Sequence, residues 1–263
     1  ESALHAARRD GNRVTMYDFE SAMDKVMMGI ERKSMVLSDQ EKEMTAYHEM
    51  GHALVGKFMP ESYPVHKVTI IPRGRALGLT SFLPEKDVHS MTKEFLESKI
   101  VIDMGGRAAE KLIFNKMNTG AAADLEDATK IAHSMVCDWG MSDALGPVKL
   151  AHHQDSVFLG REMSQPKDHS EHTAKLIDAE VRRILIDANT LATKILTDNI
   201  DKLHKFAKLL VERETLEGEE LDMLLNGEEL PPINLKTLNA MKSMKLNDTP
   251  TEEKSEEISD TKE

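Results

Sequence analysis

Two histidines and a glutamate occur at a spacing that would allow them to bind a metal ion and to use it in catalysis. His48, Glu49 and His52 form a His-Glu-x-x-His sequence, and residues four apart lie on one face of a helix, about one turn from each other. Both imidazoles can therefore reach the same ion. Glu49 is rotated by about 100° around the helix from His48, where a carboxylate can accept a proton from water and pass it to a leaving amine.

The motif needs a helix, and its flanking residues predict one. Ser38 and Glu41 have the spacing of a capping box, and the apolar pattern ends before Pro60. Both histidines fall on the apolar face, where an imidazole without a partner would be costly. The pair is therefore either satisfied by hydrogen bonds or bound to a metal, and the intervening glutamate favours the metal. The face recurs at steps of three and four residues: Met44, Tyr47, His48, Gly51, His52, Val55 and Phe58.

A catalytic zinc ion usually takes three protein ligands, and the motif supplies two. Asp124 lies on the buried edge of a helix predicted for 121–139, although it could instead serve only the N–H groups of the first helical turn. Glu110 faces inward on a helix predicted for 92–114. Periodicity does not separate these two carboxylates. Whichever of them does not bind the metal could orient a ligand imidazole.

Composition limits the kind of protein this can be. The chain has 263 residues, 30% of them charged and only 4% aromatic, with 17 methionines, which favours a mainly helical protein with an aliphatic core. The net charge of −12 gives no support for nucleic-acid binding. Cys137 is the only cysteine, so a metal would be held by histidine and carboxylate. No run of about 18 apolar residues occurs. Because the chain has no initiator methionine, we expect it to be a fragment of a longer protein.

Two short strands are predicted after the motif helix. Residues 65–71 alternate between apolar and polar, and 78–83 form a second strand that ends at Pro84. Such a hairpin could bind an extended peptide, because an open edge offers unpaired N–H and C=O groups, or it could be purely structural. The candidate substrate-binding residues are Gly78, Leu79, Thr80 and Ser81.

Most of the remaining segments are predicted to be helical, whereas 140–167 are predicted to be irregular because Gly146-Pro147, Gly160 and Pro166 interrupt them. Residues 1–33 are helical and separate from the rest of the chain, while 233–263 are polar and expected to be disordered. The further helices are expected at 169–199, 200–213 and 217–225. The fold class is thus mainly α, with a small β-hairpin or edge strand beside the motif helix.

Taken together, these residues give the chain a resemblance to the FtsH family of membrane-anchored, ATP-dependent zinc metalloproteases. The resemblance covers about residues 1–232 and is far more specific than the metal motif alone. One departure is Ala122-Ala123, where the family often has Ser-Asn. The stretches that carry it are Met27 to Ser34, Ala46 to Ala53, Val65 to Leu83, Gly105 to Glu110 and Thr119 to Leu125.

The resemblance implies roles for the candidate residues. It implies one zinc ion per chain held by His48, His52 and Asp124, with Glu49 as the general base and Glu110 as a supporting residue close by. It also implies that 78–83 belongs to the edge strand on which an unfolded polypeptide substrate lies.

The resemblance also implies a domain organisation. Residues 1–33 resemble the end of the helical lid of an AAA+ ATPase, and 34–232 resemble a mostly helical zinc metallopeptidase domain that forms a homo-hexameric ring. No Gly-x-x-x-x-Gly-Lys-Ser/Thr phosphate loop occurs, so ATP is expected to bind only in a module outside this chain. The membrane would be reached only through an anchor that is likewise outside it, and the fragment itself is expected to be soluble.

The implied function is a zinc-dependent endopeptidase, the proteolytic part of a protease that degrades unfolded or misassembled membrane and cytoplasmic proteins. The full-length protein is expected at the cytoplasmic side of the inner membrane of a bacterium. An alternative is a non-catalytic ring-assembly or binding module whose metal site is structural. Intact His48, Glu49 and His52 argue against this alternative, because a structural site would not need Glu49.

Overall fold

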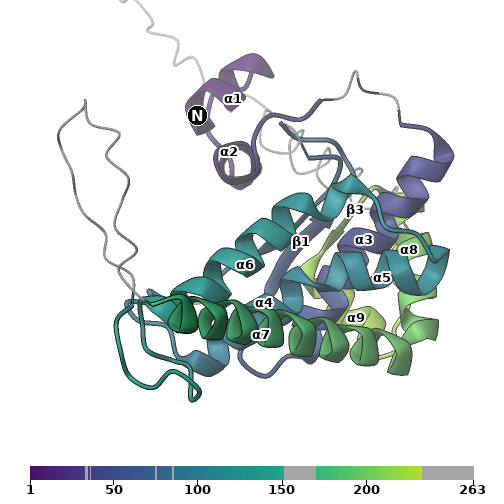
Figure 1. The fold of residues 1–263 in the computed structure, drawn as a ribbon. Coiled ribbons are helices and arrows are strands. Elements are labelled where there is room, and N and C mark those ends of the chain that lie inside the picture. Colours follow the sequence, from purple (N-terminus) through teal and green to yellow (C-terminus); the bar gives the residue numbers. More distant parts are fainter. Residues whose placement is uncertain (33–34, 36, 75, 85, 151–169, 233–263) are drawn as a thin grey trace, which may run out of the picture.

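The computed structural model describes residues 1–32, 35, 37–74, 76–84, 86–150 and 170–232 (Figure 1). The expected disorder of 233–263 and the domain boundary at residues 33–34 both fall outside these residues. The described part is mainly helical with one small antiparallel sheet, so the predicted fold class is confirmed. In this part of the chain, no helix is both long enough and apolar enough to cross a membrane.

The elements follow the predicted order closely. The helices are α1 (Ser2–Arg8), α2 (Met16–Met28), α3 (Asp39–Phe58), α4 (Lys93–Asp103), α5 (Gly105–Phe114), η1 (Thr119–Ala121), α6 (Ala122–Cys137), α7 (Glu171–Asp198), α8 (Ile200–Arg213) and α9 (Gly218–Leu225). The strands are β1 (Val65–Thr69), β2 (Leu79–Phe82) and β3 (Thr215–Glu217).

The motif helix α3 lies at the centre of the fold. Its predicted capping box is present, because Ser38 N donates to Glu41 Oε2 at 2.9 Å and Glu41 N donates to Ser38 Oγ at 3.3 Å. From there α3 runs between α5 and α8 and also contacts the sheet (Figure 1). Met50, Leu54 and Val55 of α3 are almost fully buried in the main hydrophobic core. This burial fixes the helix that carries both histidines.

The backbones of α3 and α5 approach each other at two glycines. A Cβ atom on Gly51 would lie 2.4 Å from Gly105 O, and one on Gly105 would lie 2.7 Å from Gly51 O. The prediction of one helix over 92–114 is wrong here, because the helix is interrupted at Met104 and continues as α5. Glycine is a poor helix former, so a glycine pair is a weak point at which a helix can break.

The sheet has the order β2-β1-β3, with both pairs antiparallel. The predicted hairpin is present, since Val68 pairs with Thr80 and Thr69 with Leu79. The third strand was not predicted, because three residues between two helices are too few to show alternation. Since β3 pairs with the other side of β1, β2 is an edge strand of the sheet in the described part of the chain.

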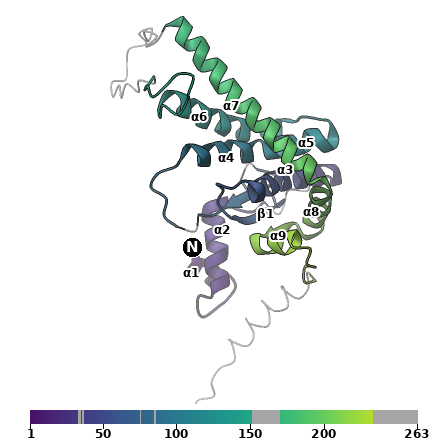
Figure 2. The ribbon, with the colours of Figure 1, turned by 90° about the horizontal axis from the view of Figure 1, so that it is seen from below.

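Helices α1 and α2 form a unit at one end of the molecule (Figures 1 and 2). Buried Asp18 holds this unit together, accepting hydrogen bonds from Arg9 Nε and Arg9 Nη2, each at 2.9 Å, and from Thr15 N at 2.8 Å. The unit reaches the sheet through an ion pair between Asp24 and Lys67 of β1.

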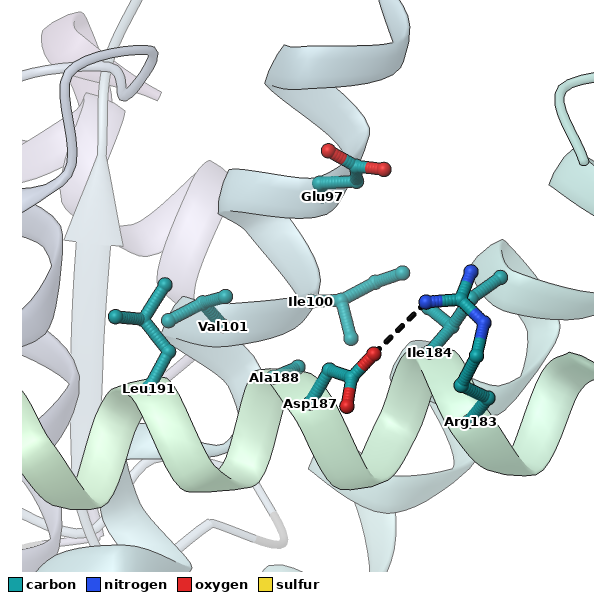
Figure 3. A pocket seen from close by; sticks show the side chains of 8 residues that line it. All are labelled: Glu97, Ile100, Val101, Arg183, Ile184, Asp187, Ala188 and Leu191. Carbon is teal, nitrogen blue, oxygen red and sulfur yellow. Dashed lines mark hydrogen bonds and ion pairs between the residues drawn. The ribbon is translucent and has the colours of Figure 1, made fainter. Parts of the chain in front are cut away.

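A groove of about 240 Å³ lies between α4 and α7 (Figure 3). Its rim carries an ion pair in which Arg183 Nη1 lies 2.8 Å from Asp187 Oδ2. None of the candidate site residues lines it, so it is separate from the predicted metal site. The lining residues are Glu97, Ile100, Val101, Arg183, Ile184, Asp187, Ala188 and Leu191.

The close approach of α3 and α5 predicts that a side chain at Gly51 would destabilise the protein. Gly51→Ala should lower the free energy of unfolding by about 1–3 kcal/mol, because the new methyl group would press on the backbone of α5. Chemical denaturation would measure this loss. Gly120→Ala is the matched control, since the nearest atom to its Cβ would be Asn118 Oδ1 at 3.5 Å. Equal stability of the two variants would contradict the packing described here.

Candidate metal centre

Three side chains meet with their donor atoms facing one another. His48 and His52 project from α3, and Asp124 projects from the first turn of α6. The two Nε2 atoms are 3.1 Å apart, and Asp124 Oδ2 lies 3.2 Å from His48 Nε2 and 3.5 Å from His52 Nε2. The fold therefore brings together the three residues that the sequence analysis offered as ligands.

The opposite nitrogen of each imidazole has its own partner. His52 Nδ1 is hydrogen bonded to the carbonyl oxygen of Ile102 at 2.7 Å, and His48 Nδ1 is bonded to Glu110 Oε1 at 2.7 Å. A carbonyl oxygen only accepts, so His52 Nδ1 must carry the hydrogen, which leaves Nε2 of the neutral ring as the free donor of an electron pair. Hydrogen bonds of this kind orient the histidines of metal sites.

The two candidate carboxylates occupy different positions around His48. Asp124 faces the Nε2 atoms, whereas Glu110, only 3% exposed, lies behind His48 against Nδ1. Asn118 can add to this arrangement, since with its amide nitrogen turned toward Glu110 it donates to Oε2 at 2.6 Å.

The spacing of the three donor atoms fits a small tetrahedral ion. With bonds of about 2.0–2.1 Å, neighbouring ligand atoms of a tetrahedral zinc ion lie about 3.3–3.4 Å apart, and the three distances here are 3.1, 3.2 and 3.5 Å. Asp124 Oδ2 is buried, and among the described residues it forms no hydrogen bond of good geometry, although the two imidazole Nε2 atoms face it. A buried carboxylate oxygen normally has such a bond, so a cation at this point would satisfy it. The donor set and the spacing both fit zinc.

The charges at this site are strongly coupled. Burial alone would lower the pKa of His48, but its contacts with Asp124 and Glu110 outweigh burial and raise the pKa to about 10. Burial likewise raises the pKa of Asp124, but the facing imidazoles of His48 and His52 outweigh it and hold that pKa well below its usual range. Without a metal, a proton thus supplies the positive charge that this arrangement of donors needs.

Glu49 lies beside the donor atoms and against β2. Its side chain is buried, and burial raises the pKa of the carboxyl. Thr80 Oγ1 lies 2.8 Å from Glu49 Oε2 and 2.9 Å from the main-chain oxygen of Glu49. Of the four candidate substrate-binding residues, Gly78 and Thr80 therefore lie against Glu49. Leu79 lies between these two residues in the sequence, and Ser81 follows Thr80 in β2.

Three positioning features were missed by the sequence analysis. The carbonyl of Ile102 and the bond between Thr80 and Glu49 depend on tertiary contacts that leave no local pattern. Gly106 is the third, since a Cβ there would lie 2.5 Å from His48 Cε1 and from His52 Nε2. The Gly105-Gly106 pair was a visible signal for close packing, but its neighbours could not be identified from the sequence.

Comparisons with known proteins show the family to which the chain is related. The chain is 51% identical over 233 residues to the ATP-dependent zinc metalloprotease FtsH of Acidobacterium capsulatum, an alignment covering 89% of this chain and 36% of that relative. It is 51% identical over 234 residues to the protein of the same name from Caulobacter vibrioides, covering 88% and 37%. The chain thus spans about a third of the length of the curated relatives it matches. Peptidase family M41 matches residues 35–224, which include the motif helix and Asp124. The chain belongs to peptidase family M41.

Proposed function

We propose that this chain is a zinc-dependent endopeptidase that cleaves flexible polypeptides. The observation that carries the proposal is the triangle of donor atoms from His48, His52 and Asp124, at the spacing of a tetrahedral ion, with the buried carboxyl of Glu49 close enough to interact electrostatically with all three side chains. The names of the relatives, which are zinc metalloproteases, support the same assignment.

The residues divide the chemistry among them. His48, His52 and Asp124 would hold the zinc ion, which when bound acts as a Lewis acid toward the peptide carbonyl and lowers the pKa of water. Glu49 would accept a proton from the attacking water and donate it to the leaving amine. Glu110 and the Ile102 carbonyl keep the imidazoles oriented. The open edge of β2 would align the substrate backbone by strand addition.

We further propose that the chain is the peptidase part of a longer ATP-dependent protease. The names of its relatives include the words ATP-dependent, and these relatives are about two and a half times as long as this chain. In this proposal residues 1–33 are the end of an ATPase lid, 34–232 form the peptidase domain, and ATP binds in a module outside this chain. Six copies would form a ring at the cytoplasmic side of a bacterial inner membrane, where the whole protein degrades unfolded or misassembled proteins.

The assignment of the third ligand predicts different outcomes for the two carboxylates. Asp124→Asn should abolish zinc binding at micromolar zinc and abolish casein cleavage, because a neutral amide oxygen is a poor ligand. Glu110→Gln keeps an acceptor for His48 Nδ1 and should weaken zinc binding only about tenfold. The zinc content of the two variants after dialysis, measured by inductively coupled plasma mass spectrometry, would distinguish these outcomes. The reverse pattern would assign the third ligand to Glu110.

The role of Glu49 predicts a separation of metal binding from catalysis. Glu49→Gln should retain zinc while the rate of casein cleavage falls by about 10²–10⁴-fold, the range that general base catalysis supplies. Chelation with 1,10-phenanthroline should abolish wild-type cleavage, and added zinc should restore it. A variant that retained zinc and cleaved at the wild-type rate would exclude Glu49 as the base.

The lack of a phosphate loop in the sequence predicts the kind of substrate. The chain alone should cleave unstructured casein but leave a stable folded domain intact, because it has no Walker-type site through which ATP could drive unfolding. Gel electrophoresis over several hours, with the folded domain and its denatured form as paired substrates, tests this. Cleavage of both forms at equal rates would contradict the prediction.

A further inference from the structure

The general base proposed above is held by the strand next to it. Thr80 Oγ1 lies 2.8 Å from Glu49 Oε2, and the same hydroxyl lies 2.9 Å from the main-chain oxygen of Glu49. The main-chain oxygen and the ionised carboxylate oxygen both accept, so the threonine hydroxyl is the donor and its single hydrogen is shared between them. A hydrogen bond to a buried carboxylate is charge-assisted and stronger than one between neutral groups. Thr80 therefore restrains one oxygen of the carboxylate.

The second oxygen of the carboxylate is confined by the residue just before β2. A Cβ on Gly78 would lie 2.8 Å from Glu49 Oε1 and 2.7 Å from Glu49 Cγ. Glu49 Oε1 thus occupies the space that a side chain would fill at this position. Together, Gly78 and Thr80 limit the carboxylate from the strand side, while α3 holds its backbone.

Among the residues that the structure describes, the strand that restrains Glu49 is paired on one side only. Thr80 pairs with Val68 of β1, and β2 is an edge of the sheet. Side chains of a strand stand roughly perpendicular to the sheet, whereas backbone N–H and C=O groups lie in its plane, so the strand whose hydroxyl reaches Glu49 also offers backbone groups along its free edge. A polypeptide added at this edge would order the strand that carries the hydroxyl.

We propose that Thr80 is a positioning residue for Glu49, and that β2 couples pairing of the substrate backbone to the orientation of this carboxylate. This inference rests on the proposed peptidase function. Part of the binding energy of the substrate backbone is then used to orient the base. Extending a peptide along β2 should accordingly raise kcat and not only lower KM.

Three threonine variants test the kinetic consequence on a fluorogenic peptide long enough to span β2. Thr80→Val preserves the shape of the side chain but removes the hydroxyl, and should lower kcat by about 10–100-fold with little change in KM or zinc content. Thr80→Ser retains the hydroxyl and should restore kcat to within about threefold of wild type. Thr69→Val is the matched control, because it removes a buried hydroxyl bonded to Thr215 in the same sheet, away from Glu49, and should leave kcat unchanged.

The kinetic results that would overturn the inference are specific. Unchanged kcat in Thr80→Val would do so, as would a change confined to KM, which would indicate a role in substrate binding alone. An equal loss of kcat in Thr69→Val would show that general weakening of the sheet is responsible.

A second measurement does not depend on turnover. Acetohydroxamate chelates zinc and donates a hydrogen bond to a neighbouring carboxylate, so its affinity for the zinc-loaded chain reports the orientation of Glu49. Thr80→Val should weaken acetohydroxamate binding several-fold in the wild-type background and have no further effect in a Glu49→Gln background. The same loss in both backgrounds would show that Thr80 does not act through Glu49.

The two measurements also separate this inference from the proposed function. A zinc-loaded wild type that bound acetohydroxamate but cleaved no peptide would overturn the peptidase function, while the double-mutant cycle would still decide the role of Thr80. A wild type that bound no zinc at all would overturn both.

Discussion

The contact between the backbones of α3 and α5 is the constraint on which the site depends. Gly51 and Gly105 touch without side chains between them, and the next residue, Gly106, lies directly against the two imidazoles. A larger residue at any of these positions would separate the helices or displace the histidines. The same contact brings Glu110 of α5 to His48 Nδ1, so one close approach provides both the space for the donor atoms and the carboxylate that orients one of them.

Each polar group of the site is held by a different element of the fold. His48 is bonded to α5, His52 to the end of α4, and Glu49 to β2. Asp124 differs, because in the described part of the chain its buried oxygen faces the two imidazoles without a hydrogen bond of good geometry. Groups already fixed in place lose little freedom when an ion or a substrate arrives, which is the physical basis of preorganisation. This oxygen therefore marks a position at which a cation would complete the site.

The sequence predicted much of this arrangement for identifiable reasons. The capping box and the apolar face of α3 are local signals, and they predicted its bounds within a residue. Periodicity showed that Asp124 and Glu110 both face inward, but it could not show which nitrogen of His48 each one faces, because that depends on how α5 and α6 pack on α3. The break at Met104 and the three residues of β3 were missed, since both are set by tertiary contacts. The roles of the site residues remain predictions, which the substitutions of Glu49, Glu110 and Asp124 would test.

The three donor residues come from distant parts of the chain, and this separation has a consequence for the stability of the folded protein. His48 and His52 come from α3, whereas Asp124 comes from α6, and helices α4 and α5 lie between them in the sequence. An ion bound by all three is a removable cross-link that closes this long loop, and the unfolded chain cannot offer the same three donors together. The melting temperature of the protein would then rise with the free metal concentration by mass action. The supply of the metal would then affect the stability of the folded protein as well as its chemistry.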